Sequence, residues 1–242
     1  MRVYNRRAFR YNPGMSETDA PAPPKKKGMN CGMWLVVGVL LLVAIGFVVP
    51  SFCGVQERAR QLQASNSARQ IMIALKSYAG DHDGLYPDAD PSNPKTSNDA
   101  FRLLIKAGML DDERVFSAPR SPSLSLIDND IGEAPDHYEA LEAGENHWCM
   151  VTGLTDESIG NHAFVFENPV DDHAWPPVWD ADAAGQPKVG RAGKGGNIII
   201  GRNDGSVNPE QLVSPTGPRV PLTDEANASL FQPGHSFLPV AK

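Results

Sequence analysis

The sequence lacks the residue arrangements that mark many familiar catalytic centres. Its 242 residues include three cysteines and no Cys-x-x-Cys pair, so a complete disulfide framework is not indicated. The six histidines never occur at His-x-x-x-His spacing, and a zinc hydrolase is therefore not supported. Neither a Gly-x-Ser-x-Gly motif nor a phosphate-binding Gly-x-x-x-x-Gly-Lys loop is present. We expect Cys149 to be a small buried hydrophobic residue rather than a reactive thiol.

Charge is also missing from one long stretch. Residues 33–52 read MWLVVGVLLLVAIGFVVPSF and contain no charged side chain. About 20 such residues in an α-helix span the ~30 Å hydrocarbon core of a bilayer. Residues 1–28 carry seven basic and two acidic groups, whereas the rest of the chain has a net charge of −12. Because basic flanks stay in the cytoplasm, we expect a single-pass inner-membrane protein with its N-terminus cytoplasmic and its head periplasmic or extracellular.

Two other interpretations of this N-terminal region are weaker. A cleaved secretory signal has an apolar region of about 7–15 residues and small residues at its cleavage site. This run is longer, and it ends in Val49-Pro50-Ser51-Phe52-Cys53, where bulky residues occupy the required positions. Nucleic-acid binding by the basic residues is disfavoured because the acidic remainder of the chain would repel phosphates.

The segment after the apolar run predicts an amphipathic helix. Residues 56–79 contain no proline or glycine, and Gly80 is expected to end the helix as a residue with positive φ. Apolar residues recur at helical spacing while polar residues fall between them. The predicted buried face consists of Ala68, Ile71, Met72, Leu75, Tyr78 and Ala79.

The remaining pattern predicts a short helix followed by an antiparallel sheet. Residues 98–108 form the helix, with Ser97 or Asn98 as its cap and Gly108 at its end. Three strands are expected over 147–152, 162–166 and 197–202. The third leads through Asn203-Asp204-Gly205, a hairpin signal, into a further strand. The expected fold class is α+β, with the long N-terminal helix packed on a small antiparallel β-sheet.

Several segments resemble bacterial pilin-like and pseudopilin-like proteins. Lys25-Lys26-Lys27-Gly28 resembles the basic leader that precedes the apolar helix in that group. The block from Asn66-Ser67-Ala68-Arg69-Gln70-Ile71 to Tyr86-Pro87 is similar to its N-L-R-Q-I-x-x-A-L-x-x-Y-x-x-D-x-D-G-x-x-P stretch. Val115-Phe116-Ser117-Ala118-Pro119 resembles a V-F-x-C-P segment, and Asn197 to Val207 resembles a terminal hairpin that ends in D-G-H-V.

The resemblance covers roughly residues 25–210 and implies a non-enzymatic, structural or assembly role. It also implies protein partners in a type II secretion or type IV pilus-like system. One position departs from the pattern, because Met33 stands where the family has a glutamate after the leader glycine. That glutamate neutralises the amine which leader cleavage frees inside an apolar bundle, where unpaired charge is costly. We therefore expect most molecules to retain the N-terminal tail.

One acidic loop is a candidate metal site. The segment 170–196 is rich in proline, glycine and aspartate, and calcium takes six to eight oxygen ligands from such loops. The resemblance adds that major pseudopilins bind calcium in a loop near their C-terminal strands. The predicted ligands are Asp171, Asp172, Asp180 and Asp182.

Together these features predict a membrane-anchored, pilin-like structural or interaction protein without enzymatic activity and without nucleic-acid partners. The alternative is a membrane-tethered enzyme or a calcium-dependent binding module in the periplasm. The predicted organisation is a disordered basic tail over 1–28, a transmembrane helix over 29–53, an amphipathic helix over 54–80, an α+β head over 81–213 and a proline-rich irregular tail over 214–242.

Overall fold

The computed structural model describes residues 31–242, without the side chains of residue 31 and residues 44–54. The chain divides into two units, Met1–Pro50 and Ser51–Lys242. The predicted disordered tail over 1–28 lies outside the described residues, and so does part of the predicted membrane helix over 29–53.

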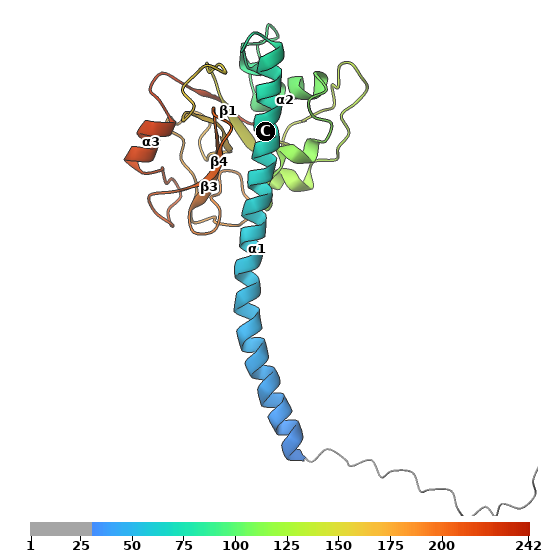
Figure 1. Cartoon of the computed structure of the whole chain (residues 1–242), viewed down its shortest axis with the longest axis vertical. Helices are drawn as coiled ribbons and strands as arrows, with labels where there is room; N and C mark the ends of the chain where they lie inside the picture. Colours follow the sequence, from blue (N-terminus) through green and yellow to red (C-terminus); the bar gives the residue numbers. More distant parts are fainter. Residues whose placement is uncertain (1–30) are drawn as a thin grey trace, which may run out of the picture. The chain divides into compact units, whose positions relative to one another are not determined.

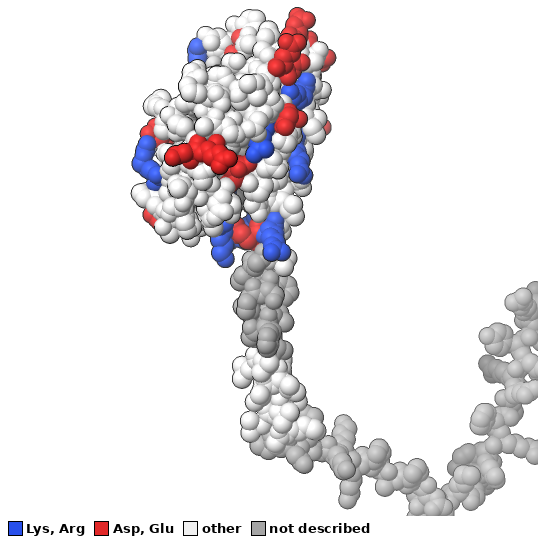
Figure 2. Space-filling view, turned by 60° about the vertical axis from the view of Figure 1, so that its left-hand side comes forward, with Lys and Arg blue, Asp and Glu red and all other residues white. Residues whose placement is uncertain are grey.

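The first unit contains the N-terminal part of helix α1 (Cys31–Asp81). Between Met33 and Val43 its ten large apolar side chains are 38–71 % exposed. Figure 2 shows no charged side chain on the described residues of this unit. Among the described residues, no helix combines the length and the apolar character that a membrane span needs.

In the second unit, α1 packs one face on the rest of the unit. Ile71, Met72, Leu75 and Tyr78 are buried, as the helical spacing predicts. The predicted end of the helix was wrong, because Gly80 lies inside α1 and the helix continues to Asp81. The residues with positive φ come later, at Asp83 and Gly84. The Gly84 N–H donates to the Ala79 carbonyl over 2.8 Å and so closes the last turn.

Helix α2 (Ser97–Lys106) confirms the predicted short helix, with a different cap. Thr96 is the N-cap, and its hydroxyl accepts from the Asp99 N–H while the Asp99 carboxylate accepts from the Thr96 N–H. Ser97, which we predicted as a cap, instead bonds elements distant in sequence: it accepts from Met150 N–H and donates to the Leu238 carbonyl. Three 3-10 helices accompany it: η1 (Pro87–Ala89), η2 (Glu113–Phe116) and η3 (Pro122–Ser125).

Five antiparallel strands form one sheet, which confirms the α+β class (Figure 1). They are β1 (Trp148–Val151), β2 (Ala163–Glu167), β3 (Asn197–Arg202), β4 (Val207–Gln211) and β5 (Phe237–Leu238), in the order β4-β3-β2-β1-β5. The predicted hairpin joins β3 to β4, with Gly205 at φ +85°. β1, β2 and β3 follow the three predicted segments within a residue, and β4 begins where the pattern indicated a further strand after the turn.

The two faces of the sheet are covered by different parts of the chain. Gly201 of β3 packs against Met72 of α1, and a Cβ atom at position 201 would lie 2.9 Å from the Met72 Cγ atom. Figure 1 shows α1 passing along the sheet. Val165 of β2 pairs with Gly201, so the next residue, Phe166, points to the opposite face. There its ring makes edge contacts with Trp179, Phe231 and Phe237.

The C-terminal segment 214–242 differs from the predicted irregular tail. It forms helix α3 (Asp224–Leu230), capped by Thr223, and strand β5, which pairs with β1. Its apolar residues enter the core: Val220, Leu222, Leu230, Phe231, Phe237 and Val240. The prolines break the regular pattern between these residues, so periodicity alone does not reveal that the segment folds back onto the sheet.

Candidate functional site

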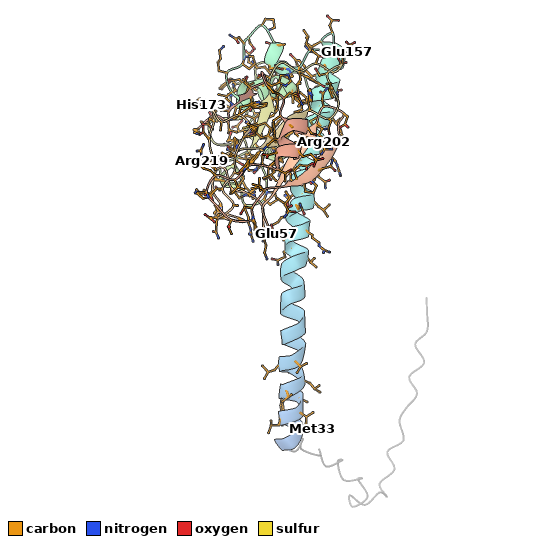
Figure 3. All side chains as sticks on the ribbon, turned by 90° about the vertical axis from the view of Figure 1, so that its left-hand side faces the viewer. Met33, Glu57, Glu157, His173, Arg202 and Arg219 are labelled. Carbon is orange, nitrogen blue, oxygen red and sulfur yellow. The ribbon has the colours of Figure 1, made fainter. Side chains whose placement is uncertain are left out.

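The predicted calcium ligands do not share one site. Each of the four aspartates has its own hydrogen-bond or salt-bridge partners. Asp171 accepts from the His173 N–H at 2.9 Å and pairs with Arg219, whose Nη2 atom lies 2.7 Å away. The hydrogen bond from Arg219 holds the pKa of Asp171 below its ordinary value. Asp172 pairs with Lys242. Figure 3 shows His173 and Arg219 on the same side of the unit.

The other two aspartates have different partners. Asp180 is buried, accepts from the Ala183 N–H at 2.9 Å and binds the Lys188 Nζ atom at 2.5 Å. The hydrogen bond from Lys188 lowers the pKa of Asp180. Asp182 accepts from the Gly217 N–H at 2.8 Å. The structure therefore does not gather these four carboxylates, and three of them fasten the loop to the C-terminal segment.

A different set of carboxylates does converge. Glu113 of η2, Asp128 and Glu145 offer oxygen atoms that all lie within 4.8 Å of one another. Within residues 31–242 this is the single group of three or more potential ligands that meets this distance. Glu113 and Glu145 are buried, whereas Asp128 is exposed. We call this group the acidic cluster.

Local hydrogen bonds fix the acidic cluster. The side chain of Asn129 accepts from the Glu113 N–H at 3.0 Å, which holds the start of η2 against the loop that follows η3. In that loop the Asp128 carboxylate accepts from the Asp130 N–H at 2.8 Å. Glu145 accepts from the Glu142 N–H at 2.6 Å, closing a turn just before β1. Three segments that are distant in sequence thus present carboxylates to one point.

The electrostatics of the acidic cluster are unusual. Glu113 is fully buried, and its Oε1 atom accepts from the Leu141 N–H at 2.5 Å. Burial raises the pKa of Glu113 to about 7, against the opposing effect of that hydrogen bond, and the neighbouring carboxylates add to the rise. Burial likewise raises the pKa of Glu145. The Glu113 Oε2 atom is buried and has no hydrogen-bond partner.

A second buried polar group lies at the end of the sheet. The Glu167 carboxylate of β2 lies 3.7 Å from the His147 Nε2 atom and 4.0 Å from the Arg191 Nη1 atom. Arg191 also donates to the Pro119 carbonyl at 2.7 Å. Burial lowers the pKa of His147, although Glu167 opposes this shift. The group connects β2, the residue before β1 and two loops, so its role is structural.

A small cavity adjoins this group. Its volume is about 50 Å³, and its lining includes Glu57 and Arg60 of α1 together with Glu167 and Arg191. Pockets for organic ligands usually measure about 300–1,000 Å³, so this one has room for water and not for a substrate.

Sequence patterns missed the acidic cluster, and the reason is its spacing. Its members are 15 and 17 residues apart, and neither interval matches a known ligand motif. The one local signal is Asp128-Asn129-Asp130, a turn-forming triplet. Comparison of the chain with models of protein families, with curated proteins and with solved structures gives no match.

Proposed function

We propose that this chain is a membrane-anchored, pilin-like or pseudopilin-like protein with a structural or interaction role. Its partners would belong to a type II secretion or type IV pilus-like system in the inner membrane. In this proposal the N-terminus is cytoplasmic and the Ser51–Lys242 unit lies on the other side of the membrane.

The observation that carries the proposal is the uncovered apolar surface of the first unit. Residues such as Leu35, Leu40 and Leu42 are 63–71 % exposed, and no charge interrupts the run from Met33 to Phe52. A surface of this kind is unfavourable in water at roughly 25 cal/mol per Å² of apolar area. Lipid tails or other apolar helices would remove that cost.

The outward face of α1 in the second unit supports an assembly role. Val55, Leu62 and Ile73 are 64 %, 62 % and 70 % exposed. Val55 and Ile73 are 18 residues apart, about five helical turns, and Leu62 lies within about 20° of the line that joins them. These three residues lie along one side of α1, with the exposed polar residue Asn66 between Leu62 and Ile73, and we call them the outer stripe. The outer stripe faces away from the buried Ile71 and Leu75, so a partner helix could contact it without disturbing the core.

The fold is also consistent with the resemblance. The pilin-like pattern implies a long N-terminal helix under a small antiparallel sheet, and α1 packs on such a sheet through Met72 and Gly201. The block that carries the strongest resemblance, residues 66–87, forms the buried end of α1 and the turn that follows it.

Two experiments test the proposal. Protease added to spheroplasts should destroy the Ser51–Lys242 unit and spare a fragment that contains residues 1–30. A photo-crosslinking amino acid at Ile73 should capture protein partners or other copies in intact cells. The matched control is Ile159, which is 67 % exposed and lies outside α1. Protection of the whole chain from protease, or equal capture from both positions, would refute the proposal.

The alternative function as a calcium-dependent binding module is favoured by one observation, the acidic cluster. Its oxygen atoms suit a hard cation. Calcium binding is also compatible with a structural role. The calcium-dependent binding module differs from the structural role only if the bound cation creates a site for a further ligand.

A further inference from the structure

We propose that Glu113, Asp128 and Glu145 form a calcium site that ties together η2, the loop after η3 and the turn before β1. This inference does not depend on membrane anchoring or on the pilin-like role. It also places calcium away from the loop of Asp171 to Asp182.

The distances between the carboxylates fit one shared cation. Calcium binds oxygen at about 2.3–2.6 Å, so two ligand atoms on one ion lie at most about 5 Å apart. The oxygen atoms of Glu113, Asp128 and Glu145 all lie within 4.8 Å of one another. Small side-chain rotations would therefore suffice to bring all three into one coordination sphere.

The Glu113 carboxylate supplies an independent indication of a ligand. Its side chain is fully buried, its Oε1 atom is satisfied by the Leu141 N–H, and its Oε2 atom has no partner. A buried acceptor without a partner costs about 1–3 kcal/mol, and more when it is charged. This carboxylate belongs to the acidic cluster, so a cation bound there would satisfy its remaining oxygen atom.

Charge balance at the cluster points the same way. None of the salt bridges formed by the described residues includes Glu113, Asp128 or Glu145. The carboxylates of Asp130 and Glu142 add further negative charge nearby. Like charges this close destabilise one another unless a cation or a shared proton intervenes.

The donor set selects the kind of cation. All three side chains offer oxygen, and no histidine or cysteine belongs to the cluster, which disfavours zinc and copper. The ligands come from the start of a 3-10 helix and from two loops, and calcium accepts variable geometry with six to eight oxygens, whereas magnesium requires a near-ideal octahedron. Calcium therefore fits better than magnesium, with backbone carbonyls and water completing its shell.

The consequence would be local order in a segment that has little regular structure. Between α2 and β1 the described chain contains only the 3-10 helices η2 and η3. A cation held by Glu113, Asp128 and Glu145 would close two loops within this segment. It would also stabilise the native state by an amount that grows with calcium concentration.

Calorimetric titration tests the site on the full-length chain, purified in mild detergent and stripped with EDTA. Calcium chloride should bind with one-to-one stoichiometry and raise the melting temperature, and magnesium chloride should bind more weakly. Asp128→Asn changes an exposed ligand, and it should weaken calcium binding roughly tenfold or more because affinity follows ligand charge. Glu145→Gln should act in the same direction.

Two control variants make the test specific. Asp136→Asn removes an exposed carboxylate from the same segment and should leave calcium binding unchanged. The double variant Asp171→Asn/Asp180→Asn should also bind as the parent does. The proposal is overturned if the parent binds no calcium, if Asp128→Asn and Glu145→Gln bind like the parent, or if the double variant loses binding. Stabilisation by acid alone, without any effect of calcium, would mean that a shared proton balances the cluster and would equally overturn it.

Discussion

Truncation of Leu75 to alanine tests how α1 contributes to the folding of the Ser51–Lys242 unit. Leu75 is fully buried on the face of α1 that contacts the core, next to Ile71 and Met72. Ile73 is only two residues away on the same helix but is 70 % exposed. The pair Leu75→Ala and Ile73→Ala therefore compares the two faces of one helical turn with almost equal changes in side-chain volume.

The expected magnitude follows from burial. Leu75→Ala removes three carbon atoms, and at about 0.8 kcal/mol each the transfer contribution is about 2.4 kcal/mol. The cavity left behind adds to this, and measured Leu→Ala changes in cores reach about 5 kcal/mol. In a domain of this size each kcal/mol lowers Tm by about 2–4 °C, so a decrease of about 5–20 °C is expected. Ile73→Ala should change stability by less than about 0.5 kcal/mol, because little area is lost and alanine favours the helix.

Thermal and urea unfolding, followed by the fluorescence of the buried Trp148 and Trp179, measure both variants against the parent. The full-length chain in detergent is the appropriate sample. Equal stability of Leu75→Ala and the parent would refute the assigned packing face. A large loss in Ile73→Ala would show that the outer stripe is needed for folding and is not a free surface.

Three further predictions follow from single sites. His147 is buried with a lowered pKa, so the unfolded chain takes up a proton below about pH 6.5 that the folded state resists. Acidification from pH 7.5 to 5.5 should therefore destabilise the parent more than His147→Gln, and equal pH slopes in urea unfolding would contradict this. Burial raises the pKa of the Cys149 thiol, so iodoacetamide should label it only after unfolding, as read by mass spectrometry. Thr96→Ala removes the capping box of α2 and should cost about 1 kcal/mol in urea unfolding, whereas Thr96→Ser should retain most of that stability.

The parts of the fold that sequence predicted are those fixed by local patterns. The 3-4 spacing of Ile71, Leu75 and Tyr78 determines which face of α1 is buried wherever that helix packs. Asn203-Asp204-Gly205 sets the hairpin because Gly205 adopts positive φ within the turn. Such features depend on a few neighbouring residues, so one sequence suffices to locate them.

The parts that were missed depend on distant contacts. β5 is two residues long, and it is a strand only because β1 offers it an edge. The helix caps show the same limit, since Ser97 has the chemistry of a cap but uses its hydroxyl to bridge Met150 and Leu238. In both cases the local sequence allowed more than one structure, and contacts with distant residues determined which one formed.

The four aspartates predicted to bind calcium show why a high density of acidic residues in a sequence is a poor guide to a metal site. Asp171, Asp172, Asp180 and Asp182 are close in sequence, yet Arg219, Lys242, Lys188 and the Gly217 N–H take them as separate partners. Three of these carboxylates already have cationic partners, and a paired carboxylate has little need of a metal ion. The acidic cluster of Glu113 has the opposite properties, because its members are scattered in sequence and form no salt bridge among the described residues.

Helix α1 of the Ser51–Lys242 unit has a buried apolar face and an exposed side that carries three apolar residues among polar ones. The inner face is built from small and medium residues such as Ala64 and Ala68, which let the helix lie close to the rest of the unit, and Met72 contacts Gly201 directly. Folding buries this inner face, so its apolar area no longer carries the free-energy cost of contact with water. The outer stripe of Val55, Leu62 and Ile73 gains nothing from folding, since each residue remains more than 60 % exposed. A helix selected for packing alone would favour polar residues at these positions, as amphipathic surface helices do. If the proposed association uses the outer stripe, changes there should affect partner binding without affecting stability.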